Sequence, residues 1–384
     1  MRFTTSYAQF AGGDTIENAK MAAKKIAADC ANINPVLVIF FAATDYDPRV
    51  LAKEMYRAFP NAKTMGCTTA GEARDGELLN GSVVAMAYSA EAFDHCRIAL
   101  VVGDGEPADS DGVFDNVDNA LAFIGEGLGG DLLSLDYRKY VGFILADRIS
   151  SFSESVLERL GERTDVIFVG GFAGDDYKFI NKQMVFYQGK AYRSAAVLAL
   201  WQPSRGFELL KTQSVGVTNT GFVITRADEE RRIIWEFNGR DAAQVYAESI
   251  NAPVETMNVI DFDENPLALT VDGEPFLRAV VKTVDNRGLQ MFASVKEGTR
   301  LTLTRSEDVL NGAADALHAK IGEMEGVAAI LHVNCASRHT ALAKRKQCDA
   351  FAALFDGIPS IAFSSYGEIY VGIVAMTSTM ILFK

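Results

Sequence analysis

The chain has 384 residues, 49% of them hydrophobic, and a formal net charge of −13 at pH 7. This length predicts about two packed domains, and the acidic balance argues against a nucleic-acid surface, which needs clustered lysine and arginine. No window approaches the ~20 uninterrupted apolar residues of a membrane span, and the amino terminus lacks the apolar core of a signal peptide. We therefore expect a cytoplasmic protein with neither nucleic-acid nor membrane partners.

After an opening helix predicted over 15–31, the chain contains the first of three similar units. Strand 36–41 leads through Asp47-Pro48, an N-cap followed by proline at the first helical position, into a helix that ends near Phe59. A short strand over 62–65 then delivers the loop 67–72, with the sequence CTTAGE. A further strand is predicted over 82–88.

The second unit has the same order of elements. It contains a strand over 141–146, a capping box at Ser151-Phe-Ser-Glu154 that opens a helix, and a strand over 166–169. That strand delivers the loop 171–175, GFAGD, and strands over 184–187 and 194–201 follow.

The third unit lies near the carboxyl terminus. A strand over 327–333 precedes a helix over 340–355, with Gly357 placed as its C-terminal cap. A strand over 360–363 delivers the loop 364–368, SSYGE, and a last strand is predicted over 377–383.

Each unit therefore consists of strand, helix, strand, a small-residue loop ending in glycine and an acid, and a further strand, with the length of a βαβ unit. These patterns predict an α/β fold in which mixed β-sheets are flanked by helices and two domains are built from repeated units. We expect domains over 1–225, with the first two units, and over 226–384, which closes with the third.

The loops at 67–72 and 171–175 resemble those of the N-terminal module of FIST proteins, a family of sensory and signal-transduction proteins. The C-terminal FIST module is similar to the second half of the chain, with Asn334-Cys335-Ala336-Ser337-Arg338 after a strand and with 363–368, FSSYGE. The resemblance implies a domain that binds an amino acid or another small molecule and reports to a partner protein.

Residues of the three loops are the candidate ligand-binding groups. Glycines at strand ends allow a ligand to approach the backbone closely, hydroxyls supply donors and acceptors, and the acids suit an amine, so that the set fits a zwitterion. The alternative is that glycines and acids only shape the turns. The candidates, with Arg338 from the family-like motif, are Cys67, Thr68, Thr69, Glu72, Gly171, Asp175, Arg338, Ser364, Ser365, Tyr366 and Glu368.

The resemblance extends to bacterial NosP-type FIST proteins, which implies haem binding, nitric-oxide sensing and a histidine kinase as partner. Haem needs an apolar slot and an axial side chain, for which His332 and His339 are the candidates. The segment 371–376 departs from this type, because it is apolar where His, Asn and Gln are expected.

An enzyme with Cys67 as nucleophile is a further alternative, since this cysteine follows a strand in a glycine-bounded loop. No histidine lies in its own unit, and no phosphate-binding or dinucleotide-binding glycine motif is present. The five cysteines contain no CxxC pair, so no metal site is predicted. We expect a binding protein and not an enzyme.

Overall fold

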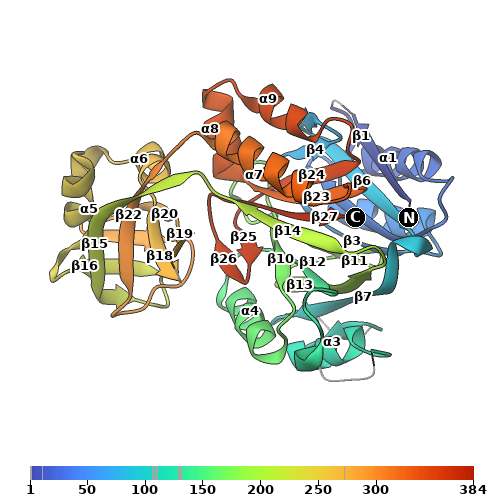
Figure 1. The fold of residues 1–384 in the computed structure, drawn as a ribbon, viewed down its shortest axis with the longest axis horizontal. Coiled ribbons are helices and arrows are strands. Elements are labelled where there is room, and N and C mark those ends of the chain that lie inside the picture. Colours follow the sequence, from blue (N-terminus) through green and yellow to red (C-terminus); the bar gives the residue numbers. More distant parts are fainter. Residues whose placement is uncertain (1, 11, 106–107, 109–110, 129–131, 272) are drawn as a thin grey trace. The chain divides into compact units, whose positions relative to one another are not determined.

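The computed structural model describes residues 2–10, 12–105, 108, 111–128, 132–271 and 273–384 (Figure 1). Contacts divide the chain into two units. Unit 1 comprises Met1–Thr212, Ala314–Gly372 and Ser378–Lys384, and unit 2 comprises Gln213–Ala313 and Ile373–Thr377. This division differs from the expected border after residue 225, because the third repeat packs with the first two, and unit 2 is inserted within it.

The predicted strand–helix–strand order is present in all three repeats of unit 1. The first repeat consists of β1 (Phe3–Gln9), α1 (Thr15–Asp29), β2 (Pro35–Ala42), α2 (Pro48–Ala58), β3 (Lys63–Thr68), β4 (Glu72–Arg74), β5 (Glu77–Leu79) and β6 (Ser82–Ser89). The second consists of β7 (Phe93–Val102), β8 (Val113–Phe114), α3 (Val117–Ile124), β9 (Val141–Ala146), α4 (Ser151–Arg163), β10 (Phe168–Phe172), β11 (Val185–Tyr187), β12 (Lys190–Tyr192) and β13 (Ala195–Pro203).

The third repeat is interrupted by unit 2 after its first strand. It consists of β14 (Phe207–Thr212), α7 (Val309–Glu323), β23 (Ala329–Cys335), α8 (Ala336–Lys344), α9 (Cys348–Ala352), β24 (Ser360–Ser365), β25 (Glu368–Tyr370), β26 (Gly372–Val374) and β27 (Ser378–Phe383). The start of α7 and most of β26 belong to unit 2 by contacts.

The helix ends follow local capping chemistry, with two corrections to the sequence predictions. Asp47 caps α2 as expected, accepting hydrogen bonds from the Arg49 and Val50 amides. The capping box of α4 lies one residue earlier than predicted, between Ser150 and Ser153. The predicted helix 340–355 is also wrong in detail. Helix α8 begins at Ala336, and Lys346, whose φ is 56°, interrupts the helical conformation before α9 begins.

Each repeat has the same arrangement of strands. The first strand of the βαβ unit (β2, β9 or β23) lies between a parallel neighbour (β3, β10 or β24) and an antiparallel one (β6, β13 or β27). Beyond the parallel strand, the next neighbour comes from a different repeat: β4 pairs with β24, β11 with β3, and β25 with β10. The three repeats thus exchange strands in a closed ring.

The inner faces of the three sheets form one hydrophobic core. Phe41 of the first sheet and Phe363 of the third lie with ring centroids 4.5 Å apart, and Phe143 and Trp201 of the second are stacked at 5.4 Å. On the outer face of the first sheet, α1 and α2 cover a second core that includes Phe40 (Figure 1). No helix among the described residues has both the length and the hydropathy to span a membrane.

Unit 2 is a smaller, mainly β structure with its own core around Phe237 and Tyr246. Its strand order is β19-β18-β22-β15-β16-β21-β20, with β17 on β16. The elements are β15 (Val215–Asp228), β16 (Ile233–Phe237), β17 (Arg240–Asp241), α5 (Ala242–Ile250), α6 (Val259–Glu264), β18 (Leu267–Val271), β19 (Glu274–Arg278), β20 (Val280–Val284), β21 (Gly288–Met291) and β22 (Arg300–Ser306).

Close packing of the loops between repeats predicts a strict requirement for Gly174. A Cβ atom there would lie 2.5 Å from the Ala70 amide nitrogen, which is backbone and has no room to move aside. We expect Gly174→Ala to lower the free energy of unfolding by about 1–3 kcal/mol, the usual range for overpacking, measured by urea unfolding. The control is Gly161→Ala in α4, where nothing lies within 4 Å. Equal stability of the two variants would contradict the prediction.

Candidate functional site

The three glycine-acid loops meet at the carboxyl ends of the parallel strands and are joined by main-chain hydrogen bonds. The Ala70 amide donates to the Ser364 carbonyl (3.0 Å), the Gly174 amide to the Thr68 carbonyl (2.9 Å), and the Tyr366 amide to the Phe172 carbonyl (3.2 Å). Each loop is therefore bonded to a loop of another repeat. The structure brings together the loop residues that the sequence singled out.

Hydroxyls of the first loop are satisfied within the protein. Thr68 accepts a hydrogen bond from the Met184 amide (3.0 Å), and the Thr69 hydroxyl donates to Glu72. Glu72 also accepts from the amide (3.1 Å) and hydroxyl (2.7 Å) of Ser82. All three loop residues are buried, so these groups form an internal network.

The third loop repeats this arrangement. The Ser365 hydroxyl donates to Glu368 (2.6 Å), at the same spacing as Thr69 and Glu72, and both residues are fully buried. Ser364 is buried and contributes its main chain to the contact with Ala70. Glu72 and Glu368 are therefore equivalent: each is bonded to a hydroxyl three residues earlier, and each is the first residue of an exchanged strand, β4 or β25.

Burial raises the pKa of Glu72 to about 8, even though its hydrogen bonds with Thr69 and Ser82 oppose the shift. The folded state therefore favours the protonated acid, and the unfolded chain, with an ordinary pKa near 4.5, releases the proton first. Stability from this group is fully present below pH 4.5 and is lost as the pH rises towards about 8.

We therefore expect Glu72→Gln, which cannot ionise, to reduce the loss of stability between pH 5 and about 8. Urea unfolding midpoints measured across this range test the effect. The control is Glu54→Gln on α2, where the acid is on the surface and paired with Arg57 at 2.9 Å. An unchanged pH profile in the Glu72 variant would show that Glu72 is not the titrating group.

The second loop differs from the other two. Buried Asp175 accepts hydrogen bonds from the Phe179 and Ile180 amides (2.9 Å each) and from the Tyr366 hydroxyl (2.7 Å). Gly171 lies where a Cβ atom would be 2.7 Å from Val333 Cγ1, so close packing requires a glycine there. Asp175 thus links the second loop to the third and organises the residues that follow it.

Arg338 is the candidate whose bonding is least complete. It is 2% exposed, donates two hydrogen bonds of 3.3 Å to the carbonyl and hydroxyl of Thr212, and its Nε has no partner among the described residues. Burial lowers its pKa to about 10, while Cys335 and Glu368 nearby favour the charged form. The guanidinium is therefore charged at pH 7 and only partly paired.

The two histidines proposed for haem line one small cavity of about 30 Å³ with Phe351 and Phe355. This volume suits about one water molecule. His332 is 2% exposed, its Nε2 lies 2.5 Å from the Ser378 hydroxyl, and burial lowers its pKa to about 3. The His332 and His339 site does not fit a haem, which needs a large apolar slot. The described residues also contain no group of three side chains suited to a metal ion.

Cys67 is fully buried in the common core at the end of β3. Burial, with a smaller effect of Glu72, raises the pKa of its thiol well above the ordinary value. Both effects oppose the thiolate that a nucleophile needs.

We expect iodoacetamide at pH 7.5 to leave Cys67 unmodified in the folded protein and to modify it in urea, as followed by peptide mass spectrometry. Cys348, which is more exposed, serves as the internal comparison and should react first. Labelling of native Cys67 faster than Cys348 would contradict its burial.

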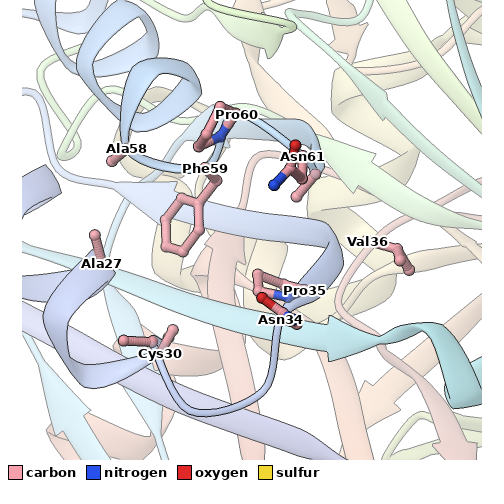
Figure 2. A pocket seen from close by; sticks show the side chains of 11 residues that line it. Ala27, Cys30, Asn34, Pro35, Val36, Ala58, Phe59, Pro60 and Asn61 are labelled. Carbon is pink, nitrogen blue, oxygen red and sulfur yellow. The ribbon is translucent and has the colours of Figure 1, made fainter.

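A shallow depression of about 410 Å³ lies at the opposite end of the first sheet, where α1 and α2 end and β2 and β3 begin. Figure 2 shows the Phe59 ring extending toward Cys30, with Pro60 and Asn61 above and Asn34 and Pro35 below. Asn34, Pro60 and Asn61 are exposed, and no charged side chain lines the depression. It is separate from the three loops.

Comparison with protein families identifies the chain. The FIST N domain matches residues 36–240 and the FIST C domain matches residues 242–371. Because the first match alone covers more than half of the chain, the protein belongs to the FIST family, which confirms the resemblance seen in the loops. FIST domains are associated with signal transduction and the sensing of small ligands. A search of curated proteins found no match.

The border between the two family matches does not coincide with the border between the compact units. The FIST N match runs past β14 into the first strands of unit 2, and the FIST C match includes the third repeat as far as β25. Sequence reasoning missed Tyr177 and Phe179, which follow Asp175. The available signal was the longer segment between the acid and the next strand in the second repeat.

Proposed function

We propose that this protein is a sensor that binds a small molecule with a carboxylate group, and that Arg338 is the residue that holds the carboxylate. The partly paired guanidinium is the observation that carries the proposal. A buried arginine is normally hydrogen-bonded on several of its five N–H groups, whereas Arg338 has two long bonds to a single residue. A carboxylate bound side-on would pair with two of them.

Access to Arg338 supports a sensing role. Arg338 is 2% exposed, so a ligand reaches its guanidinium only after a neighbouring segment moves. The Tyr177 hydroxyl donates to the carbonyl of Ala336, the first residue of α8, at 3.1 Å. Cys335 lies near enough to influence the pKa of both Tyr177 and Arg338. We infer that the bond between Tyr177 and Ala336 breaks when the ligand binds, while Asp175 continues to hold the Phe179 and Ile180 amides.

The remaining bonds of Arg338 suggest how occupancy is transmitted. Thr212 is the last residue of unit 1 before the chain first enters unit 2, and it is the register partner of Ser378, where the chain returns from the second segment of unit 2. A ligand that draws Arg338 away from Thr212 alters the hydrogen bonds at the residue from which the chain enters unit 2. The change would then be reported to a signalling partner, for which a histidine kinase remains a prediction from the family resemblance.

A haem-based nitric-oxide sensor is supported by the family resemblance alone, since the pocket at His332 and His339 does not fit the group. The acids and hydroxyls of the loops hold the fold around the proposed site, and Arg338 and the segment after Asp175 make the ligand contacts. An amino acid remains the first ligand to test, because its carboxylate suits Arg338.

Replacing Arg338 by glutamine is expected to weaken amino-acid binding strongly. Isothermal titration with the twenty amino acids identifies the ligand in the wild type, and the same titration is repeated with Arg338→Gln. Loss of a charge-assisted pair costs about 1.5–3 kcal/mol, or roughly 10- to 150-fold in affinity. Arg138→Gln is the control, because that arginine is exposed and bonded to neighbouring Asp136.

Tyr177→Phe gives an independent test that leaves Arg338 intact. Without the bond to Ala336 the open form is more populated, and the apparent affinity should rise by up to about tenfold. Full binding by Arg338→Gln, or weaker binding by Tyr177→Phe, would contradict the proposed site.

A further inference from the structure

The segment that follows Asp175 breaks the symmetry of the three repeats. In the first and third repeats the acid is itself the first residue of the next strand, β4 or β25, whereas in the second repeat residues 176–184 intervene before β11. We refer to residues 175–182 as the 175–182 loop. It lies at the carboxyl ends of the parallel strands, the edge where open α/β sheets bind their ligands.

The 175–182 loop is attached to all three repeats. In the first repeat, the Thr44 amide donates to Asp176 (2.8 Å), and in the third repeat Ala336 accepts from Tyr177. Within its own repeat, Asp175 accepts from the Phe179 and Ile180 amides. These bonds hold a backbone in which Asp176, Tyr177, Phe179 and Asn181 have φ between 51° and 59°. Such conformations are rare for residues other than glycine and require support from the surroundings.

The held loop presents an aromatic ring to solvent. Phe179 is stacked on Tyr366, with ring centroids 4.8 Å apart and an angle of 12° between the planes, yet 63% of Phe179 is exposed. Tyr177 lies 6.4 Å from the same Tyr366 ring. Since Tyr366 covers one face of Phe179, the exposure belongs to the rest of the ring, which is fixed in place and available for stacking.

Hydrogen bonds connect the residues around the stacked Phe179 and Tyr366 rings to the neighbourhood of the proposed carboxylate site. Tyr366 donates its hydroxyl to Asp175, and burial, followed by that bond to Asp175, raises its pKa, so that it stays a donor at neutral pH. Tyr177, two residues before Phe179, contacts Ala336, two residues before Arg338. These contacts place the 175–182 loop beside the first turn of α8, the helix that carries Arg338.

We propose that the open part of the Phe179 ring is a stacking subsite for a planar aromatic group, so that the ligand is an aromatic carboxylate such as an aromatic amino acid. This rests on the proposed function, in which Arg338 holds the carboxylate. An aromatic pair adds affinity beyond simple burial of area, by about 3- to 10-fold. An aliphatic side chain of similar size lacks this term.

Isothermal titration with three probes tests the subsite: L-phenylalanine, L-leucine and L-phenylalanine methyl ester, which has no free carboxylate. We expect phenylalanine to bind wild type about 3- to 10-fold more tightly than leucine, and the ester to bind at least 10-fold more weakly than phenylalanine. Phe179→Leu should remove the preference for phenylalanine over leucine. Tyr137→Leu, at an exposed aromatic residue elsewhere, is the matched control and should keep the preference.

The outcomes separate the two proposals. Equal binding of phenylalanine and leucine by wild type, or a preference that survives Phe179→Leu, overturns the aromatic subsite and leaves the carboxylate site standing. An ester that binds as well as phenylalanine overturns the role of Arg338 and leaves the stacking subsite standing. Absence of binding by all three probes overturns both.

Discussion

The hydrogen bonds that join the three loops are the constraint on which unit 1 depends. Each loop donates a main-chain amide to a loop of another repeat, and each repeat passes a strand to a neighbouring sheet. No repeat therefore has a complete sheet by itself. Closure of the ring also places the two ends of the chain in one core, where the Phe3 and Phe383 rings lie 5.5 Å apart. The chain first enters unit 2 after Thr212 and leaves it for the last time before Ser378, and these two residues are register partners in the pair β14 and β27.

Much of the repeat architecture was predictable because it is encoded locally. Runs of apolar residues predicted strands β9 and β24 to within two residues, and the capping residue predicted the start of α2. The exchange of strands was not predictable, because the sequence of β4 fits an edge of any sheet and its partner β24 lies in another repeat. For the same reason the expected border after residue 225 separated the third repeat from the two with which it packs.

The candidate site shows the same limit. The sequence identified the correct loops, but hydrogen-bonding capacity alone does not distinguish a ligand contact from an internal one. Thr69 and Ser365 satisfy the buried acids Glu72 and Glu368, as the cost of an unpaired buried carboxylate requires. The second loop, which has fewer hydroxyls, is instead the one followed by exposed aromatic residues. Its role follows from tertiary contacts of Asp175, which no local pattern reports.

In the proposed sensor, the position of Arg338 determines how large a conformational signal the ligand can produce. Within the described part of the chain, the hydrogen bonds of the Arg338 side chain go to Thr212, the last residue before the chain enters unit 2. A ligand shifts a conformational equilibrium by no more than its difference in affinity for the two states. Two hydrogen bonds from a charged donor are lost when Arg338 leaves Thr212, and bonds of this kind contribute about 1.5–3 kcal/mol each, which is comparable with the usual coupling energy between sites. His332 contacts Ser378 on the paired strand, so that Thr212 and Ser378, at two of the four points where the chain passes between the units, both lie beside buried, polar side chains of the third repeat. A sensor built in this way needs no movement of the three-loop junction itself, so its stability and its response are separable.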